Sequence, residues 1–187
     1  TVAQTNAALR TYFAKVSNFL SSLASPRGAR FLNAPYGAFQ DSTDQTATNT
    51  TTAYAITFDT TDFANGITLS NSSRINVSQD GLYNIQFSIQ FKNTTNDTQD
   101  VEVWFKKNGT NVDKSNSRFG LQARKSSGDP SHLIGALNFY VNLTTNDYIE
   151  LMWRVSDVGV SIEASSATTS PTRPASPSLI LTVTQVA

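Results

Sequence analysis

Residues 81–92 read Gly-Leu-Tyr-Asn-Ile-Gln-Phe-Ser-Ile-Gln-Phe-Lys, and large apolar side chains alternate with mostly polar ones along the whole stretch. Successive side chains of a β-strand point to opposite faces, so a period of two predicts a strand with one buried face and one mostly polar face. One-sided strands of this kind are typical of antiparallel sheets. The stretch therefore predicts an antiparallel β protein.

Similar segments recur towards the C-terminal end of the sequence. Strands are expected at 53–58, 67–70, 74–78, 82–92, 100–107, 117–123, 132–143, 147–155, 159–164 and 178–186. Turn-forming residues separate them, and Asn108-Gly109 is the strongest hairpin signal. Short strands joined by tight turns predict a β-sandwich or jelly roll. Pro171, Pro174 and Pro177 predict a polyproline-like crossing before the last strand.

The composition narrows the classes of partner and of chemistry. The 187 residues include 14 Lys plus Arg, 14 Asp plus Glu and no cysteine, and the formal net charge is zero. A neutral chain gives no electrostatic reason to expect nucleic acid or an anionic membrane as a partner. Without cysteine, neither a disulfide nor a thiolate metal site can form.

An apolar stripe predicts a helix over residues 1–24. Its members are Leu9, Tyr12, Phe13, Val16, Phe19, Leu20 and Leu23. Most of them follow the heptad spacing of three and four residues, and Ser25-Pro26 is expected to end the helix. A helix this short is marginal by itself in water, so the stripe needs a partner. That partner is the chain's own β domain, copies of the same helix, or another protein surface.

Residues 25–52 predict an extended arm that leads into a β domain over residues 53–187. The arm combines turn-forming residues with apolar side chains that show no clear periodicity, and such segments are expected to lie in grooves of another surface. The candidate docking residues are Arg27, Arg30, Phe31, Leu32, Tyr36 and Phe39. The two arginines are expected either to meet acidic groups on a partner or to keep a linker in solution.

No residue pattern in the sequence predicts catalysis. His132 is the single histidine, and the sequence contains no Gly-x-Ser-x-Gly nucleophile motif. Asp41, Asp44, Asp59 and Asp62 lie in Thr-rich segments, where carboxylates either cap turns or bind calcium. We therefore expect a protein that is not an enzyme, with no cofactor and with no catalytic or metal-binding residues.

Three segments resemble motifs of the C1q/TNF-like jelly rolls, in the same order. Residues 80–87, Asp-Gly-Leu-Tyr-Asn-Ile-Gln-Phe, resemble the G-x-Y-x-F-x-F strand of that family. Residues 105–112 resemble its K-N-G-x-x-V hairpin, and residues 143–151 resemble its L-x-x-G-D-x-V-x-L hairpin, with Asn146 in the place of Gly. Taken over its whole length, the sequence is most similar to the jelly-roll structural proteins of tailed bacteriophages, of the capsid-decoration or head-fibre type.

The resemblance implies a jelly roll assembled as a homotrimer. Together with the predicted helix and arm, we expect an all-β, antiparallel jelly-roll sandwich with a short N-terminal α-helix and an extended arm. Apolar residues on both faces of several strands agree with burial in a subunit interface. The candidate interface residues are Leu82, Tyr140, Tyr148 and Met152.

The implied function is that of a virion structural protein. We expect a trimeric decoration (cement) protein on a phage capsid, attached through its N-terminal helix and arm to the major capsid protein or to another virion protein. Its expected location is the virion surface, after assembly in the host bacterial cytoplasm. The alternatives are a receptor-binding tip or fibre knob that recognises a host surface glycan or protein through loops 93–99 and 124–131, and a soluble C1q-like lectin.

Overall fold

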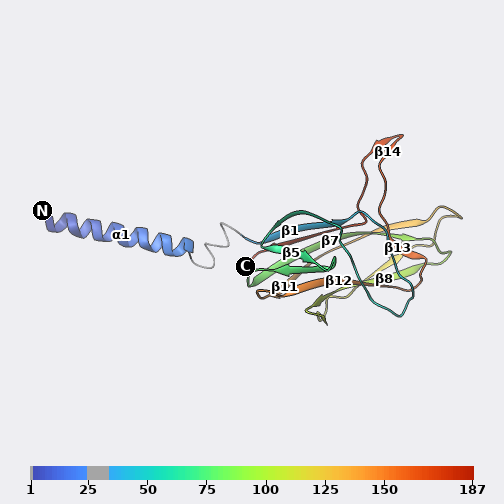
Figure 1. Ribbon diagram of the computed structural model, residues 1–187, viewed down its shortest axis with the longest axis horizontal. Coiled ribbons are helices and arrows are strands. Elements are labelled where there is room, and N and C mark those ends of the chain that lie inside the picture. The colour runs from blue at the N-terminus through green and yellow to red at the C-terminus, as the bar shows by residue number, and fades with distance from the viewer. Residues whose placement is uncertain (1, 25–33) are drawn as a thin grey trace.

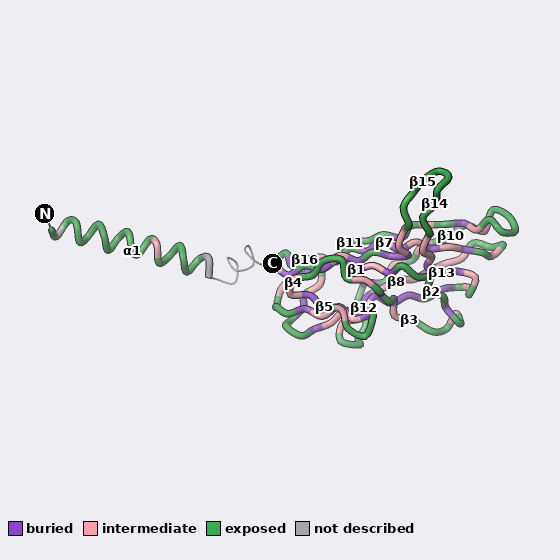
Figure 2. Tube along the Cα trace, turned by 45° about the horizontal axis from the view of Figure 1, so that its top comes forward, coloured by how far each residue is buried: buried purple, intermediate pink, exposed green. Residues whose placement is uncertain are grey.

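The computed structural model describes residues 2–24 and 34–187. Helix α1 (Val2–Ala24) lies apart from a β domain in which antiparallel sheets pack face to face (Figure 1). The exposed helix and the buried interior of the β domain contrast in Figure 2. The core of the described chain is therefore the core of the β domain.

The first sheet is built around β7, the strand that the alternating sequence predicts. Its members are β1 (Tyr36–Asp41), β2 (Gln45–Thr46), β4 (Thr60–Asn65), β7 (Gly81–Asn93), β11 (Ser131–Leu143), β13 (Val160–Ile162) and β16 (Leu179–Gln185). Strand β11 pairs with one edge of β7, while β16 and β13 pair with the other. Strand β1 lies beyond β16, and β4 lies beyond β1.

The second sheet packs on the first. Its members are β3 (Tyr54–Ala55), β5 (Ile67–Ser70), β6 (Arg74–Val77), β8 (Gln99–Lys107), β9 (Thr110–Asn111), β10 (Ser117–Leu121) and β12 (Tyr148–Val155). The strand order across it is β10-β8-β12-β6-β5, with β3 paired to β12 and β9 paired to β8. A separate hairpin of β14 (Thr168–Thr169) and β15 (Thr172–Arg173) rises away from the domain (Figure 1).

Apolar side chains that point between the sheets form one continuous core. Trp153 is the largest fully buried side chain. Aromatic rings meet across the two sheets: the ring centres of Phe87 and Phe105 are 6.0 Å apart, and those of Phe91 and Phe119 are 5.8 Å apart. Such aromatic pairs add to the stability that burial of their area provides.

The structure confirms the predicted antiparallel all-β sandwich with an N-terminal helix. Asn108 and Gly109 have φ angles of 49° and 80°, so both residues of the predicted hairpin turn between β8 and β9 have the positive φ that such a turn requires. Asn146 has a φ of 69°. Asparagine tolerates the left-handed region better than most residues do, which explains how it stands where the family motif has Gly.

The predicted chain path is wrong at four places. The expected arm over residues 25–52 contains β1 and β2, so the β domain begins before residue 53. The predicted polyproline-like crossing is the β14–β15 hairpin with its flanking residues. The predicted strand 53–58 is only the short β3, and β4 lies in a segment for which no strand is expected.

Candidate interaction surface

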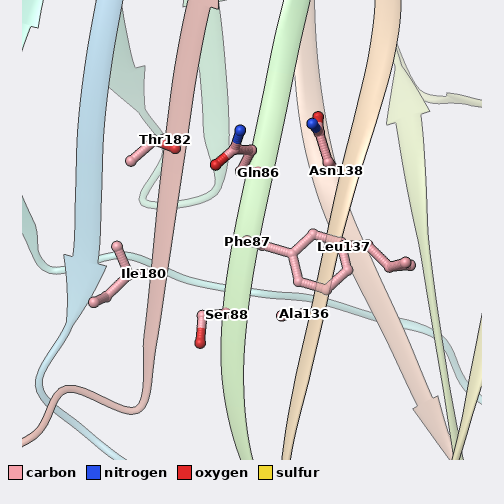
Figure 3. Close-up of a pocket in the computed structure, with 8 residues that line it drawn as sticks. All are labelled: Gln86, Phe87, Ser88, Ala136, Leu137, Asn138, Ile180 and Thr182. Atoms are coloured by element: carbon pink, nitrogen blue, oxygen red, sulfur yellow. The ribbon is translucent and has the colours of Figure 1, made fainter.

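The outward side chains of the first sheet form aligned rows across β16, β7 and β11. Ile180, Ser88 and Ala136 are in register in one row. Thr182, Gln86 and Asn138 form the next row, as Figure 3 shows. A hollow of about 560 Å³ lies over these two rows.

We call the outward surface of β4, β1, β16, β7 and β11 the neutral face. Its members are Tyr36, Ala38, Gln40, Phe63, Leu82, Asn84, Gln86, Ser88, Gln90, Ile134, Ala136, Asn138, Tyr140, Ile180, Thr182 and Thr184.

Large apolar side chains are exposed on the neutral face. Phe63 is 71% exposed and Ile134 is 65% exposed, while Tyr36, Tyr140 and Ile180 are also exposed. At the outward positions of β1, β7, β11 and β16, the charged or imidazole side chains are Lys92 and His132, at one end of the sheet. On the edge strand β4, the carboxylate of Asp62 accepts a hydrogen bond from Nε2 of Gln40 at 3.1 Å. An apolar surface with few charges, all at its margins, is costly to leave in water and suits burial against another protein surface.

A cluster of ionisable groups lies at the end of the first sheet that contains Lys92 and His132. Glu163 accepts a hydrogen bond from Lys92, and its other carboxylate oxygen lies 2.9 Å from Nε2 of His132. Partial burial would raise the pKa of the Glu163 carboxyl, but Lys92 and His132 outweigh this effect and hold the pKa below its ordinary value. The single histidine is therefore an exposed hydrogen-bond partner of Glu163 at the surface.

The outward face of the second sheet has the opposite character. Glu102 pairs with Arg118 at 3.0 Å and with Arg154 at 3.4 Å. Arg74 pairs with Glu150 at 3.4 Å, and its guanidinium carbon lies 4.5 Å from the ring centre of Tyr148. Charges that satisfy each other at a solvated surface need no partner chain, so this face resembles a surface that remains in water.

The four predicted interface residues lie on both outer faces. Leu82 and Tyr140 belong to the neutral face, where the Tyr140 hydroxyl lies 3.2 Å from Nδ2 of Asn84. Tyr148 and Met152 belong to the charged second sheet, and Met152 is only 5% exposed. One flat contact cannot use all four, because the two faces look in opposite directions. For Met152, burial within its own chain leaves little area for a partner.

The predicted helix stripe is on the surface. Leu9, Tyr12, Phe13, Phe19 and Leu20 are exposed, and Val16 is partly buried. The side chain of Leu23 lies outside the described residues. The stripe is therefore not buried against the chain's own β domain (Figure 2), which contradicts the first of the three partners considered from the sequence.

The predicted arm residues divide into three groups. Arg27, Arg30, Phe31 and Leu32 lie outside the described residues. Phe39 is fully buried in the core of its own chain, so it cannot dock on another surface. Tyr36 is exposed on β1 and belongs to the neutral face. Buried and outward residues alternate along β1, where Phe39 and Asp41 are buried. This period of two could have predicted the strand, but it is short and the flanking sequence is irregular.

The four Thr-rich aspartates accept hydrogen bonds within the chain, among them Asp62, which accepts one from Nε2 of Gln40 at 3.1 Å. Asp41 accepts a hydrogen bond from the backbone nitrogen of Thr43 at 2.7 Å, and Asp59 accepts one from that of Ser42 at 2.9 Å. Asp44 accepts a hydrogen bond from the backbone nitrogen of Ala164 at 2.8 Å. Within residues 2–24 and 34–187, no three acidic or histidine side chains gather in a group suited to a metal ion.

The two loops expected to face a receptor lie against each other. The backbone nitrogen of Arg124 donates to the carbonyl oxygen of Thr95 at 2.9 Å, and Nε of Arg124 donates to the side-chain oxygen of Asn96 at 2.8 Å. Loops 93–99 and 124–131 therefore form one continuous surface at an end of the domain.

Ile134, Ile180 and Phe63 are exposed apolar residues that the sequence analysis did not select. A signal for Ile180 was present, because Leu179-Ile180-Leu181 places apolar side chains on both faces of one strand. Phe63 had no such signal, since β4 does not alternate and contains a bulge opposite Ala38 and Phe39.

In the described part of the chain, no helix is both long and apolar enough to cross a lipid bilayer. Comparison of the sequence with models of protein families found no match, and comparison with curated proteins found none.

Proposed function

We propose that the protein is a non-enzymatic virion structural protein, a homotrimer that decorates a tailed-phage capsid and is attached through its N-terminal segment. The observation that carries the proposal is the contrast between the two outer faces. One face exposes Phe63, Ile134 and Ile180 on a largely uncharged surface, with charged or imidazole groups only at its margins: Asp62 on the edge strand β4, and Lys92 with His132 at one end. The other face carries paired charges. Only the first would gain by leaving water.

The order of strands supports the jelly-roll part of this proposal. From β1 and β2 in the first sheet the chain crosses to β3 in the second, returns with β4 and crosses to β5 and β6. It returns with β7, crosses again to β8, β9 and β10, and returns with β11. The next crossing leads to β12, and β16 ends beside β1. Repeated crossing between two sheets, with the last strand beside the first, is the pattern of a jelly roll.

Trimer formation is inferred from the resemblance together with the neutral face. In a threefold assembly, one patch of each copy contacts a different patch of the next copy, and the ring closes after three copies. No apolar patch then remains exposed for further association. The exposed stripe of α1 offers a second contact, either with the same helix in the other two copies or with a capsid protein. Three weak attachments on one particle would bind strongly together.

The neutral face provides the test of assembly. Ile180→Lys places a charge in the middle of that face, and we expect the full-length protein to change from trimer to monomer in sedimentation equilibrium. Thr68→Lys is the matched control, because Thr68 is exposed on β5 of the second sheet. A wild-type protein that is monomeric at micromolar concentration, or an Ile180→Lys variant that remains trimeric, would contradict the proposed interface.

A receptor-binding tip is the second candidate function. The contact between loops 93–99 and 124–131 favours it, since a recognition surface is usually built from neighbouring loops on a rigid scaffold. Copy number on the particle separates the two candidates: decoration requires hundreds of copies, whereas a fibre requires a few dozen or fewer. Imaging of particles with and without the protein gives that number.

A further inference from the structure

A hollow of about 390 Å³ lies beside Trp104, on the charged outer side of the second sheet and away from the neutral face. Trp104 is on β8 between the buried residues Val103 and Phe105, so its indole points outward. The other residues that line the hollow are Glu102, Asn111, Val112, Asp113, Lys114 and Asn116. The hollow thus joins an aromatic wall to several polar side chains.

The indole of Trp104 is held in place by its neighbour. Nε1 of Trp104 donates a hydrogen bond to the side-chain oxygen of Asn111 at 2.9 Å. Asn111 itself is held in β9, which pairs with β8 through Lys106. The polar edge of the ring is therefore satisfied, and the apolar part of the ring that lines the hollow is available to a ligand.

The loop that supplies the other lining residues is anchored to β8 through Ser115. Ser115 is buried, and its hydroxyl accepts from the backbone nitrogen of Phe105 at 3.0 Å and donates to the carbonyl oxygen of Val112 at 2.8 Å. Lys114 has a φ of 59°, a conformation that is unusual for a residue with a long side chain. Backbone strain held by fixed contacts is a feature of binding loops, because a preorganised site loses less freedom when it binds.

Several polar groups of the hollow are not used within the chain. In the described residues, the side chains of Asp113, Lys114 and Asn116 form no hydrogen bond or ion pair. The charge of Glu102 is already balanced by Arg118 and Arg154. The remaining carboxylate and ammonium, on Asp113 and Lys114, offset each other, so the hollow does not select for an anion or a cation.

We propose that this hollow binds a neutral sugar, with one pyranose ring stacked on Trp104 and its hydroxyl groups bonded to Asp113, Lys114 and Asn116. A pyranose has an apolar face of C–H groups and a rim of hydroxyls that both donate and accept hydrogen bonds. That combination matches a flat aromatic wall flanked by an amide, a carboxylate and an ammonium group. A small concave site with few, fixed polar groups is the usual form of a small-ligand site.

The two tryptophans of the chain make the test direct. Trp153 is fully buried, so the indole N–H signals of full-length protein in a ¹⁵N–¹H spectrum provide one reporter in the hollow and one internal control. We expect millimolar N-acetylglucosamine, glucose or galactose, or a β-linked dimer of one of them, to shift the Trp104 signal in a saturable manner and to leave the Trp153 signal in place. If none of these sugars shifts the Trp104 signal, the proposal is wrong.

Variants then locate the site by titration calorimetry with the sugar that binds. Asp113→Ala and Asn116→Ala should each weaken binding by about threefold to tenfold, because each removes one ligand hydrogen bond from an exposed loop and leaves the core intact. Trp104→Ala should abolish binding and Trp104→Phe should retain part of it. Thr68→Ala, at an exposed position of β5 that does not line the hollow, is the control. Unchanged affinity in the Asp113, Asn116 and Trp104 variants would overturn the assignment, whatever the state of assembly of the protein.

Discussion

Nδ2 of Asn108 donates a hydrogen bond to Oδ1 of Asp147 at 2.6 Å, and this bond joins the two hairpins that resemble family motifs. The side-chain oxygen of Asn108 also accepts from the backbone nitrogen of Tyr148 at 3.0 Å. The other carboxylate oxygen of Asp147 accepts from the backbone nitrogen of Thr144 at 2.7 Å and pairs with Nζ of Lys107 at 2.6 Å. One buried carboxylate thus holds two turns together at one end of the sandwich.

Replacement of this carboxylate should destabilise the fold. Asp147→Ala leaves the backbone nitrogen of Thr144 and the amide of Asn108 without their acceptor, and we expect a loss of about 2–3 kcal/mol in the free energy of unfolding. Urea denaturation followed by far-ultraviolet circular dichroism measures it. Asp97→Ala should have little effect, because Asp97 is exposed. Equal stability of both variants would show that the contact does not contribute.

Acid should weaken the fold through the same residue. Burial would raise the pKa of the Asp147 carboxyl, but the bonds from Lys107, Thr144 and Asn108 dominate and hold the pKa well below its ordinary value of 3.8. The unfolded chain therefore binds the proton more readily than the folded chain does. The stabilisation is complete above about pH 5 and is lost as the pH falls through the ordinary value and then the lowered one.

Denaturation midpoints of the wild type and of Asp147→Asn, measured from about pH 6 to pH 3, test this prediction. The wild type should lose stability more steeply on acidification, so the difference between the two proteins should shrink. Glu163 contributes in the same direction in both proteins, because its pKa is also lowered, and its effect cancels in the comparison. Parallel pH profiles would exclude a role for the Asp147 charge.

A glycine in β11 makes room for an aromatic pair. A Cβ added at Gly135 would lie 2.6 Å from Cε2 of Phe91 and 3.2 Å from Cε1 of Phe119, two rings in contact across the sheets. Gly135→Ala should therefore lower the free energy of unfolding by about 1–3 kcal/mol through overpacking. Gly120→Ala on β10 is the control, since its nearest neighbour is a side-chain oxygen of Asp100 at 3.7 Å. A stable Gly135→Ala variant would mean that the rings move aside without cost.

The helix should act separately from the stability of the β domain. Phe19 is 63% exposed on α1, so Phe19→Asp should leave the thermal unfolding of the β domain unchanged. Under the proposed function it should abolish attachment to particles or assembly of the helices. Sedimentation with particles and calorimetry of the free protein measure the two effects. Normal attachment of the variant would remove the proposed role of the helix stripe.

Local patterns in the sequence determined several elements. The alternation of residues 81–92 predicts β7, and the Asn-Gly pair predicts the β8–β9 turn, because both signals depend on the geometry of neighbouring residues alone. The heptad stripe predicts α1 in the same way. The structure contains these elements as predicted, because each pattern acts through neighbouring residues and does not depend on contacts with distant parts of the chain.

Only the tertiary structure decided which strands are neighbours and which side chains therefore lie on the same face of a sheet. Strand β1 is held by its pairing with β16, at the other end of the chain, and this pairing converts the expected arm into part of the core. The neutral face likewise depends on the register of β4, β1, β16, β7 and β11, which brings Phe63 and Ile134 onto one surface. Strand pairing is a long-range interaction, and the side chains of one strand do not specify which strand will lie beside it.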